Sequence, residues 1–149
     1  ADVKLIEVPY KGGAPAATDL MGGQVDLAFL NVPAVLSQVQ GGQLRALAVA
    51  SATRAKALPD TPTMAEAGYP DFAMSTWYGI SAPAGTSREI VGKLHAAIAQ
   101  TLNTPKMRDK IESQGAQVFL KGPDEYGAYL QADAKLMLEL IKLANMTAN

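Results

Sequence analysis

VPYKGGAPAATDL, residues Val8–Leu20, contains the pattern that decides the fold, because the end of a strand is followed directly by the start of a helix. Lys4–Val8 is predicted to be a strand that Pro9 closes. Ala14–Met21 is predicted to be a short helix, since Pro15 suits a first helical turn. The lysine and two glycines between them leave two interpretations open, a tight turn or a binding place for an anion. Local spacing alone favours the turn.

The same strand-and-helix pattern continues beyond this stretch. Val25–Leu30 is a mostly apolar predicted strand, Pro33–Gln40 a second short helix, and Leu44–Ala50 a third predicted strand. Strands that alternate with single helices at short spacing predict a parallel sheet with right-handed crossovers. The expected fold class is therefore α/β, a parallel sheet with flanking helices.

The second half is predicted to be mainly helical. Thr86 and Glu89 have capping-box spacing at the start of a helix that reaches Leu102. Acidic residues occupy the first turn of a long final helix, where the helix dipole favours them. The other predicted elements are one helical turn near Thr63–Ala67, a strand over Ala73–Ala82, a helix from Pro105 to Gly115, and a short strand Val118–Leu120.

The predicted sheet is unevenly covered. Three parallel strands in chain order, joined by crossovers of one hand, place both connecting helices on one face and leave the other face bare. Parallel sheets are normally covered on both faces. The second half has the opposite imbalance, with three helices and two short strands. We therefore expect the 149 residues to be the C-terminal portion of a longer protein, or to need a partner segment.

Composition excludes several classes of protein. The net charge is −1 and the basic residues are scattered, so no nucleic-acid partner is predicted. There is no cysteine, which removes disulfides, thiolate metal sites and cysteine nucleophiles. No apolar stretch reaches the roughly 18 residues that a membrane span requires. The N-terminus has no signal-peptide pattern, so an export signal is not expected within this chain.

Catalytic and metal-binding motifs are not found. The sequence has no Gly-x-Ser-x-Gly or His-Glu-x-x-His motif, and its one histidine, His95, lies within a predicted helix between apolar neighbours. The acidic residues are spread out rather than grouped as metal ligands. Gly85–Leu94 has the wrong glycine spacing for a phosphate-binding loop. We therefore predict no catalysis, no metal and no cofactor.

Two strand-to-helix junctions remain as candidate binding sites. They are Tyr10–Pro15 and Leu30–Ala34. Ligands of open parallel sheets bind beyond the carboxyl ends of the strands, where helix N-termini converge. At each junction a proline favours the helix start while neighbouring amides stay free to bind an anion.

Several strings of sequence resemble one known family over nearly the whole chain. They are VPYKGGAPAATDLMGGQVDLAF, GGQLRALAVAS, ALPDTPTMAEAGYPDF, STWYGISAPAGTSREIV, TPKMRDKIESQGAQV and GPDEYGAYL. Together they resemble the Bug family, the extracytoplasmic solute receptors of tripartite tricarboxylate transporters. Members are about twice as long, so this chain is similar to the C-terminal half of one.

The resemblance implies a periplasmic binding protein of type II, here incomplete. It places residues 1–72 in a partial second lobe with the ligand loops, and residues 73–149 in a crossing strand and C-terminal helices of the first lobe. It implies a periplasmic receptor that captures a small organic carboxylate, without catalysis, for the membrane components of a transporter. The alternative is a receptor fold used for sensing or partner interaction. A complementary N-terminal fragment or a strand-exchanged dimer is a further expected partner.

The family's ligand residues transfer to the two junctions. By this resemblance Gly12, Gly13 and Ala14 hold a ligand carboxylate through backbone amides, and Asn31 lines the same cleft. The weaker candidates are Thr18, Val32 and Lys11.

Side chains near the junctions bear on the ligand class. Leu30 stands where many members carry aspartate. If Leu30 faces the cleft, an acceptor for an ammonium group is missing, and a dicarboxylate or aromatic acid is favoured over an amino acid. An equally weighted alternative is that Leu30 only ends the strand and faces the core. Trp77 and Tyr78 either stack on the ligand or pack, and packing is favoured.

Overall fold

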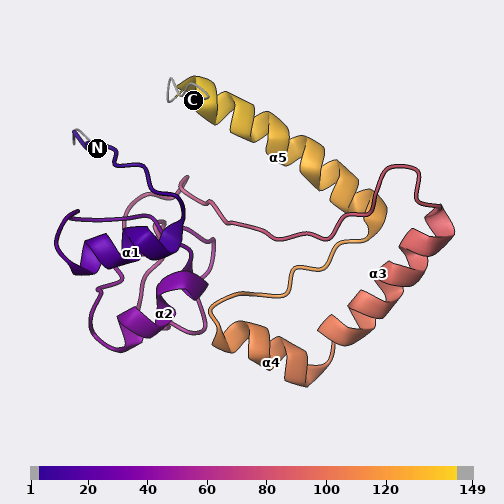
Figure 1. Cartoon of the computed structure of the whole chain (residues 1–149), viewed down its shortest axis with the longest axis horizontal. Coiled ribbons are helices and arrows are strands. Elements are labelled where there is room, and N and C mark those ends of the chain that lie inside the picture. Colours follow the sequence, from indigo (N-terminus) through magenta and orange to yellow (C-terminus); the bar gives the residue numbers. More distant parts are fainter. Residues whose placement is uncertain (1–3, 144–149) are drawn as a thin grey trace. The chain divides into compact units, whose positions relative to one another are not determined.

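The computed structural model describes residues 4–143 of the chain. Within them the chain forms five α-helices joined by turns and irregular segments (Figure 1). These are α1 (Gly13–Met21), α2 (Val32–Gln40), α3 (Arg88–Leu102), α4 (Pro105–Ser113) and α5 (Pro123–Leu143). Each corresponds to a helix predicted from the sequence, so the helical part of the prediction is confirmed.

The predicted strands are not joined into hydrogen-bonded ladders within residues 4–143. One isolated parallel bridge links Val49 to Thr63. Val49 N donates to Pro62 O over 2.8 Å, and Met64 N donates to Val49 O over 2.9 Å. A helix satisfies its backbone hydrogen bonds locally, whereas a strand needs a neighbour from elsewhere in the protein. The sheet is therefore incomplete in this chain.

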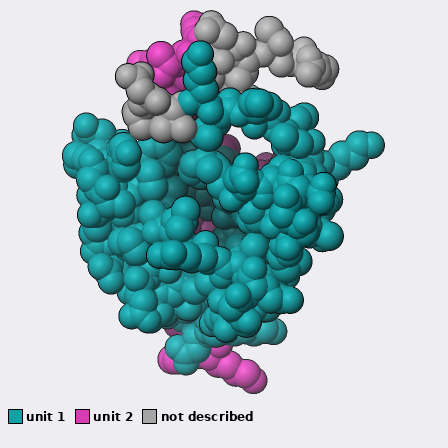
Figure 2. All heavy atoms as spheres, turned by 90° about the vertical axis from the view of Figure 1, so that its left-hand side faces the viewer, with its two compact units in different colours: residues 1–79, 108–117 teal, residues 80–107, 118–149 magenta. Residues whose placement is uncertain are grey.

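The contacts divide the chain into two compact units, coloured separately in Figure 2. Unit 1 comprises Ala1–Gly79 and Arg108–Gln117, and unit 2 comprises Ile80–Met107 and Val118–Asn149. The lobe assignment of residues 1–72 and 73–149 is a statement about a complete receptor, so it stays a prediction.

Unit 1 has a small core. Helices α1 and α2 pack against each other. Their buried side chains are joined by others from the segment that follows α2. The buried residues are Ala16, Ala17, Val35, Leu36, Val49, Ala55, Thr61 and Thr63.

A short turn closes the irregular part of unit 1. Thr63 Oγ1 accepts from Glu66 N over 3.1 Å, and Glu66 Oε2 accepts from Thr63 N over 2.7 Å. This is a reciprocal capping box. Ala67 N donates to Thr63 O over 3.0 Å, which confirms the predicted helical turn. Arg54 Nε pairs with the Glu66 carboxylate at 2.9 Å, so the turn is also tied to the preceding segment.

Two contacts help to join the segment from Arg108 to Gln117 to the rest of unit 1. Lys56 Nζ forms an ion pair with Glu112 Oε2 at 2.9 Å. Gly115 has a φ of +82° and lies so close to Val32 that an added Cβ would stand 2.5 Å from Val32 Cγ1. A glycine is therefore required here both by the backbone conformation and by the close approach to the start of α2.

Unit 2 contains contacts between α3 and α5 but no buried side chain within its described helices. Ser87 caps α3, because its side chain accepts from Ile90 N over 3.3 Å. The predicted Thr86–Glu89 capping box is therefore wrong. Thr86 Oγ1 donates to Pro83 O, and Glu89 pairs with Lys93 at 2.7 Å one turn further along the helix. The serine is one residue closer to the first turn and reaches its amide.

The start of α5 has a side-chain contact that the sequence pattern did not predict. Glu125 Oε2 accepts from Gly122 N over 3.1 Å, so an acidic side chain in the first turn satisfies the amide before the helix. Nearby, the rings of Phe119 and Tyr129 meet edge to face, with centroids 5.8 Å apart. Lys121 Nζ lies 4.7 Å from the Phe119 ring centre. These contacts hold the segment before α5 against the helix.

Candidate functional site

The structure brings the two predicted junctions together. A Cβ built on Gly13, the first residue of α1, would lie 3.7 Å from both Ala34 Cβ and Leu30 Cδ2. Ala34 belongs to the first turn of α2, and Leu30 ends the segment before it. The N-termini of α1 and α2 are therefore neighbours, although many positions separate Gly13 from Val32 along the chain.

The N-terminus of α1 is not capped by a side chain. Gly12 precedes the helix with φ 133° and ψ 173°, a conformation that disfavours any residue with a Cβ. The amides of Gly12, Gly13 and Ala14 donate no hydrogen bond to a described residue. Pro15 contributes no amide. Three adjacent donors thus remain available at the positive end of the helix dipole.

The N-terminus of α2 is likewise uncapped. Asn31 precedes the helix in an extended conformation, with φ −68° and ψ 132°, and its side chain accepts no hydrogen bond from the helix. Ala34 N donates to Asn31 O over 2.9 Å, whereas the Asn31 and Val32 amides donate to no described residue. The Asn31 side chain instead accepts from Thr76 Oγ1 over 2.9 Å.

Three weaker candidates have different positions. Thr18 is exposed and one turn into α1, and its hydroxyl donates to Ala14 O over 3.1 Å. Val32 is half-buried beside Gly115, so its side chain serves packing while its amide stays unbonded. Lys11 is exposed and forms no ion pair with the described residues. Of these three residues, only Val32 has a backbone amide in the first turn of one of the two helices.

Leu30 is half-buried, and its side chain contacts the first residue of α1. It therefore packs between the two helix starts and provides an apolar surface where an aspartate would provide a charge. This position agrees in part with each of the two predicted alternatives, since the side chain packs at the edge of the site.

Tyr10 and Asp19 were missed by sequence reasoning. Tyr10 Oη donates to Asp19 Oδ2 over 2.8 Å and ties the segment before the glycines to the middle of α1. The hydrogen bond to Asp19 raises the pKa of Tyr10, with partial desolvation and the nearby negative charge adding to the shift. No sequence pattern marks a tyrosine and an aspartate nine positions apart as partners.

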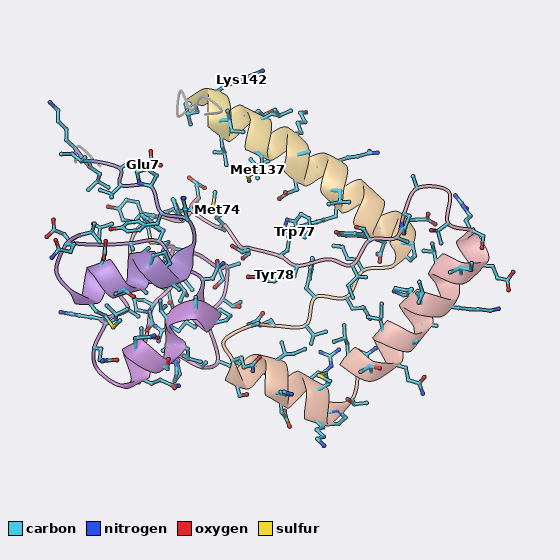
Figure 3. The ribbon with its side chains drawn as sticks, in the orientation of Figure 1. Glu7, Met74, Trp77, Tyr78, Met137 and Lys142 are labelled. Carbon is cyan, nitrogen blue, oxygen red and sulfur yellow. The ribbon has the colours of Figure 1, made fainter. Side chains whose placement is uncertain are left out.

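Trp77 and Tyr78 follow Thr76 in the same extended segment of unit 1. Figure 3 shows them on opposite sides of the chain, as expected for consecutive extended residues. Trp77 is half-buried, whereas Tyr78 is 79% exposed. Tyr78 is therefore not buried within the described residues, and its packing role in a complete receptor stays a prediction.

The described residues do not assemble a metal site or a catalytic histidine pair. No group of three or more metal-ligating side chains lies within residues 4–143. The buried Nε2 of His95 has no hydrogen-bond partner within these residues. None of the described helices is both long and apolar enough to span a membrane.

Comparison with known proteins identifies the family. A model of the tripartite tricarboxylate transporter family receptor matches residues 1–146. The chain belongs to this receptor family. Among curated relatives, Protein BugT of Bordetella pertussis is 40% identical over 123 residues, which is 83% of this chain and 38% of BugT.

Solved structures of the same family share the fold. The periplasmic binding protein BugD has a TM-score of 0.83 and 37% identity, over 96% of this chain and 48% of BugD. The R. palustris protein Rpa4515, solved with adipate, has a TM-score of 0.85 and 35% identity, over 93% of this chain and 46% of that protein. MatC of Rhodopseudomonas palustris, solved with bound malate, has a TM-score of 0.66 and 34% identity, over 79% of this chain and 40% of MatC.

These likenesses confirm the predicted family and fold class. The chain has the α/β fold of periplasmic binding proteins. It spans less than half the length of the relatives just described. The family and the fold are those of solute-binding receptors rather than enzymes.

Proposed function

We propose that this protein is a periplasmic receptor that binds a small organic carboxylate, without turnover, for the membrane components of a tripartite tricarboxylate transporter. The observation that carries the proposal is the pair of adjacent, uncapped helix N-termini in a member of this receptor family. Two helix dipoles and several unbonded amides favour an anion with more than one acceptor oxygen.

The proposed ligand contacts are the backbone amides of the two helix starts. On α1 they come from Gly12, Gly13 and Ala14, and on α2 from Asn31 and Val32. The Asn31 side chain would add a donor through Nδ2. Lys11 would add only long-range attraction, because it is exposed. Thr18 would contact only a hydroxyl or another donor group of the ligand, because its own hydroxyl proton is donated to Ala14 O.

The proposed ligand class is a dicarboxylate or an aromatic acid rather than an amino acid. Leu30 places an apolar side chain against the start of α1, where an ammonium group would require an acceptor. Two related structures hold the dicarboxylates adipate and malate. An apolar ligand chain or ring would lie favourably against Leu30.

We also propose that residues 1–72 belong to the second lobe of the receptor and residues 73–149 to the first. Within the described residues, large apolar side chains of the predicted strands are exposed, with Ile6 at 93% and Phe29 at 75%. Such surface is normally covered in a folded receptor. A complementary N-terminal segment, or a strand-exchanged second copy, would cover it. Light scattering with mass spectrometry would distinguish these two arrangements from a lone monomer.

The function is tested by thermal unfolding of the full-length product of the gene, with a panel of mono-, di- and aromatic carboxylates at millimolar concentration. We expect at least one dicarboxylate or aromatic acid to raise Tm by several degrees, since a ligand at about one hundred times its Kd stabilises by about 2.7 kcal/mol. The diesters of the same acids, which lack the anion, are the control and should have no effect. An unchanged Tm across the whole panel would contradict the proposed ligand class.

A further inference from the structure

We propose that Thr76 is a positioning residue that gives the site its preference for a carboxylate over a carboxamide, by fixing which end of the Asn31 side-chain amide is left for the ligand. The inference rests on the proposed function, because it concerns the same ligand contacts. Thr76 Oγ1 donates to Asn31 Oδ1 over 2.9 Å, although 45 positions separate the two residues. Both residues belong to unit 1.

An asparagine before a helix normally uses its side chain on the helix itself. Its Oδ1 accepts from an amide of the second or third helical residue and satisfies one of the unbonded donors. Here that contact is absent. The second helical residue is Pro33, which has no N–H, and the third, Ala34, already donates to Asn31 O. Neither helix position therefore has an amide free for Asn31 Oδ1, which accepts from Thr76 Oγ1 instead.

As a consequence, the two N–H donors of Asn31 Nδ2 have a fixed orientation. A side-chain amide has an acceptor on one end and an NH₂ with two donors on the other. With Oδ1 bound to Thr76, Nδ2 is the free end, and it makes no hydrogen bond within the described part of the chain. The Asn31 and Val32 backbone amides are unbonded donors as well. A carboxylate has only acceptor oxygens, so it can accept hydrogen bonds from these donors. A carboxamide would instead place its own NH₂ group against them.

Loss of the Thr76 hydroxyl would release this restraint. The Asn31 amide could then rotate and direct Oδ1 towards the ligand. In that orientation it repels a carboxylate and accepts from a carboxamide. The effect on folding should be small, because Thr76 and Asn31 are both exposed and no buried group loses its partner.

The test compares binding of adipate with its monoamide, adipamic acid, and of malate with malamic acid, by calorimetry on the full-length product of the gene. For Thr76→Val we expect about three- to tenfold weaker binding of the dicarboxylate, a smaller loss or a gain for the monoamide, and a Tm without ligand within about two degrees of the original. Thr76→Ser keeps the hydroxyl and should restore the original ratio of affinities.

Thr101→Val is the matched control, since Thr101 is also exposed and its hydroxyl donates to Ala97 O within α3 of unit 2. It should change neither affinity. Equal weakening of acid and monoamide in Thr76→Val, or a Tm loss that accounts for the weakening, would overturn the positioning role while leaving the proposed function intact. If neither dicarboxylate binds the unsubstituted protein, the dicarboxylate form of the proposed function fails, and this inference fails with it.

Discussion

Two helix starts in unit 2 and two in unit 1 differ in whether a side chain bonds to their first backbone amides. In unit 2, Ser87 caps α3 and Glu125 bonds back to the amide before α5. In unit 1, the residues that precede α1 and α2, Gly12 and Asn31, provide no side-chain cap. Capping normally adds about 1 kcal/mol to stability. The uncapped starts therefore forgo stability and keep donors available, as expected for the binding surface that we propose.

The largest effect is expected from Gly115→Ala, which disturbs the uncapped start of α2. The new Cβ would stand 2.5 Å from Val32 Cγ1, and the backbone would be held at a φ of +82°. Strain and overpacking together should lower the free energy of unfolding by about 3 kcal/mol. Urea unfolding followed by circular dichroism measures this change, and the calorimetric affinity for adipate should fall with it.

Gly85→Ala is the matched control for that substitution. Gly85 has a similar φ of +87° but open space where a Cβ would stand. The loss should be about 1 kcal/mol, because only backbone strain is added. Similar losses at both glycines would show that the contact between Gly115 and Val32 is unimportant.

A smaller effect should separate the two kinds of helix start directly. Ser87→Ala removes a cap and should cost about 1 kcal/mol of stability without changing carboxylate affinity. Asn31→Ala removes no cap, so stability should change by less than about 0.5 kcal/mol, whereas affinity should fall about tenfold. Urea unfolding and calorimetry on both variants provide the comparison. A destabilised Asn31→Ala with unchanged binding would reverse our assignment of roles.

The smallest effect is expected at the capping box formed by Thr63 and Glu66, where the accepting carboxylate of Glu66 is ionisable. The hydrogen bond from Arg54, and then that from Thr63 N, lower the pKa of Glu66 below its ordinary value of 4.5. A lowered pKa in the folded state stabilises the protein above pH 4.5, and this contribution is lost as the pH falls through the lowered pKa. Exposure of the ion pair keeps the contribution small.

Glu66→Gln tests this pH dependence. At about pH 7 the original protein should unfold at a slightly higher urea concentration than the variant, and the difference should disappear well below pH 4.5. A difference that persists or grows in acid would mean that the Glu66 carboxylate does not act through its charge.

The helices were predictable from sequence because their determinants are local. Prolines near the first turns, glycines after the last turns and apolar spacing located all five helices, with most ends within about two residues. The cap of α3 was placed one residue early, since Thr86 and Ser87 are equivalent caps by composition and only the path of the chain chooses between them. The strands were less predictable in their pairing, because a ladder depends on a distant neighbour.

The candidate site was predictable in its amides but not in its side chains. The glycines and prolines of the two junctions are local features of the chain, and they are enough to indicate unbonded donors. The contacts Tyr10–Asp19 and Thr76–Asn31 could not be inferred, since no periodicity relates residues 9 or 45 positions apart. That α1 and α2 begin side by side was expected only from the general behaviour of parallel α/β folds.

Three properties follow from local patterns and strings in the sequence: which segments become helices, which helix starts keep free amides, and the receptor family of the chain. These properties depend on neighbouring residues or on long strings of sequence, so they can be read along the chain. The tertiary structure alone decided that Gly13 lies against Leu30 and Ala34, that Gly115 supports the start of α2, and that Thr76 restrains Asn31. Each of these contacts joins residues far apart in the sequence, and only packing of the folded chain brings their atoms within a few ångströms of one another.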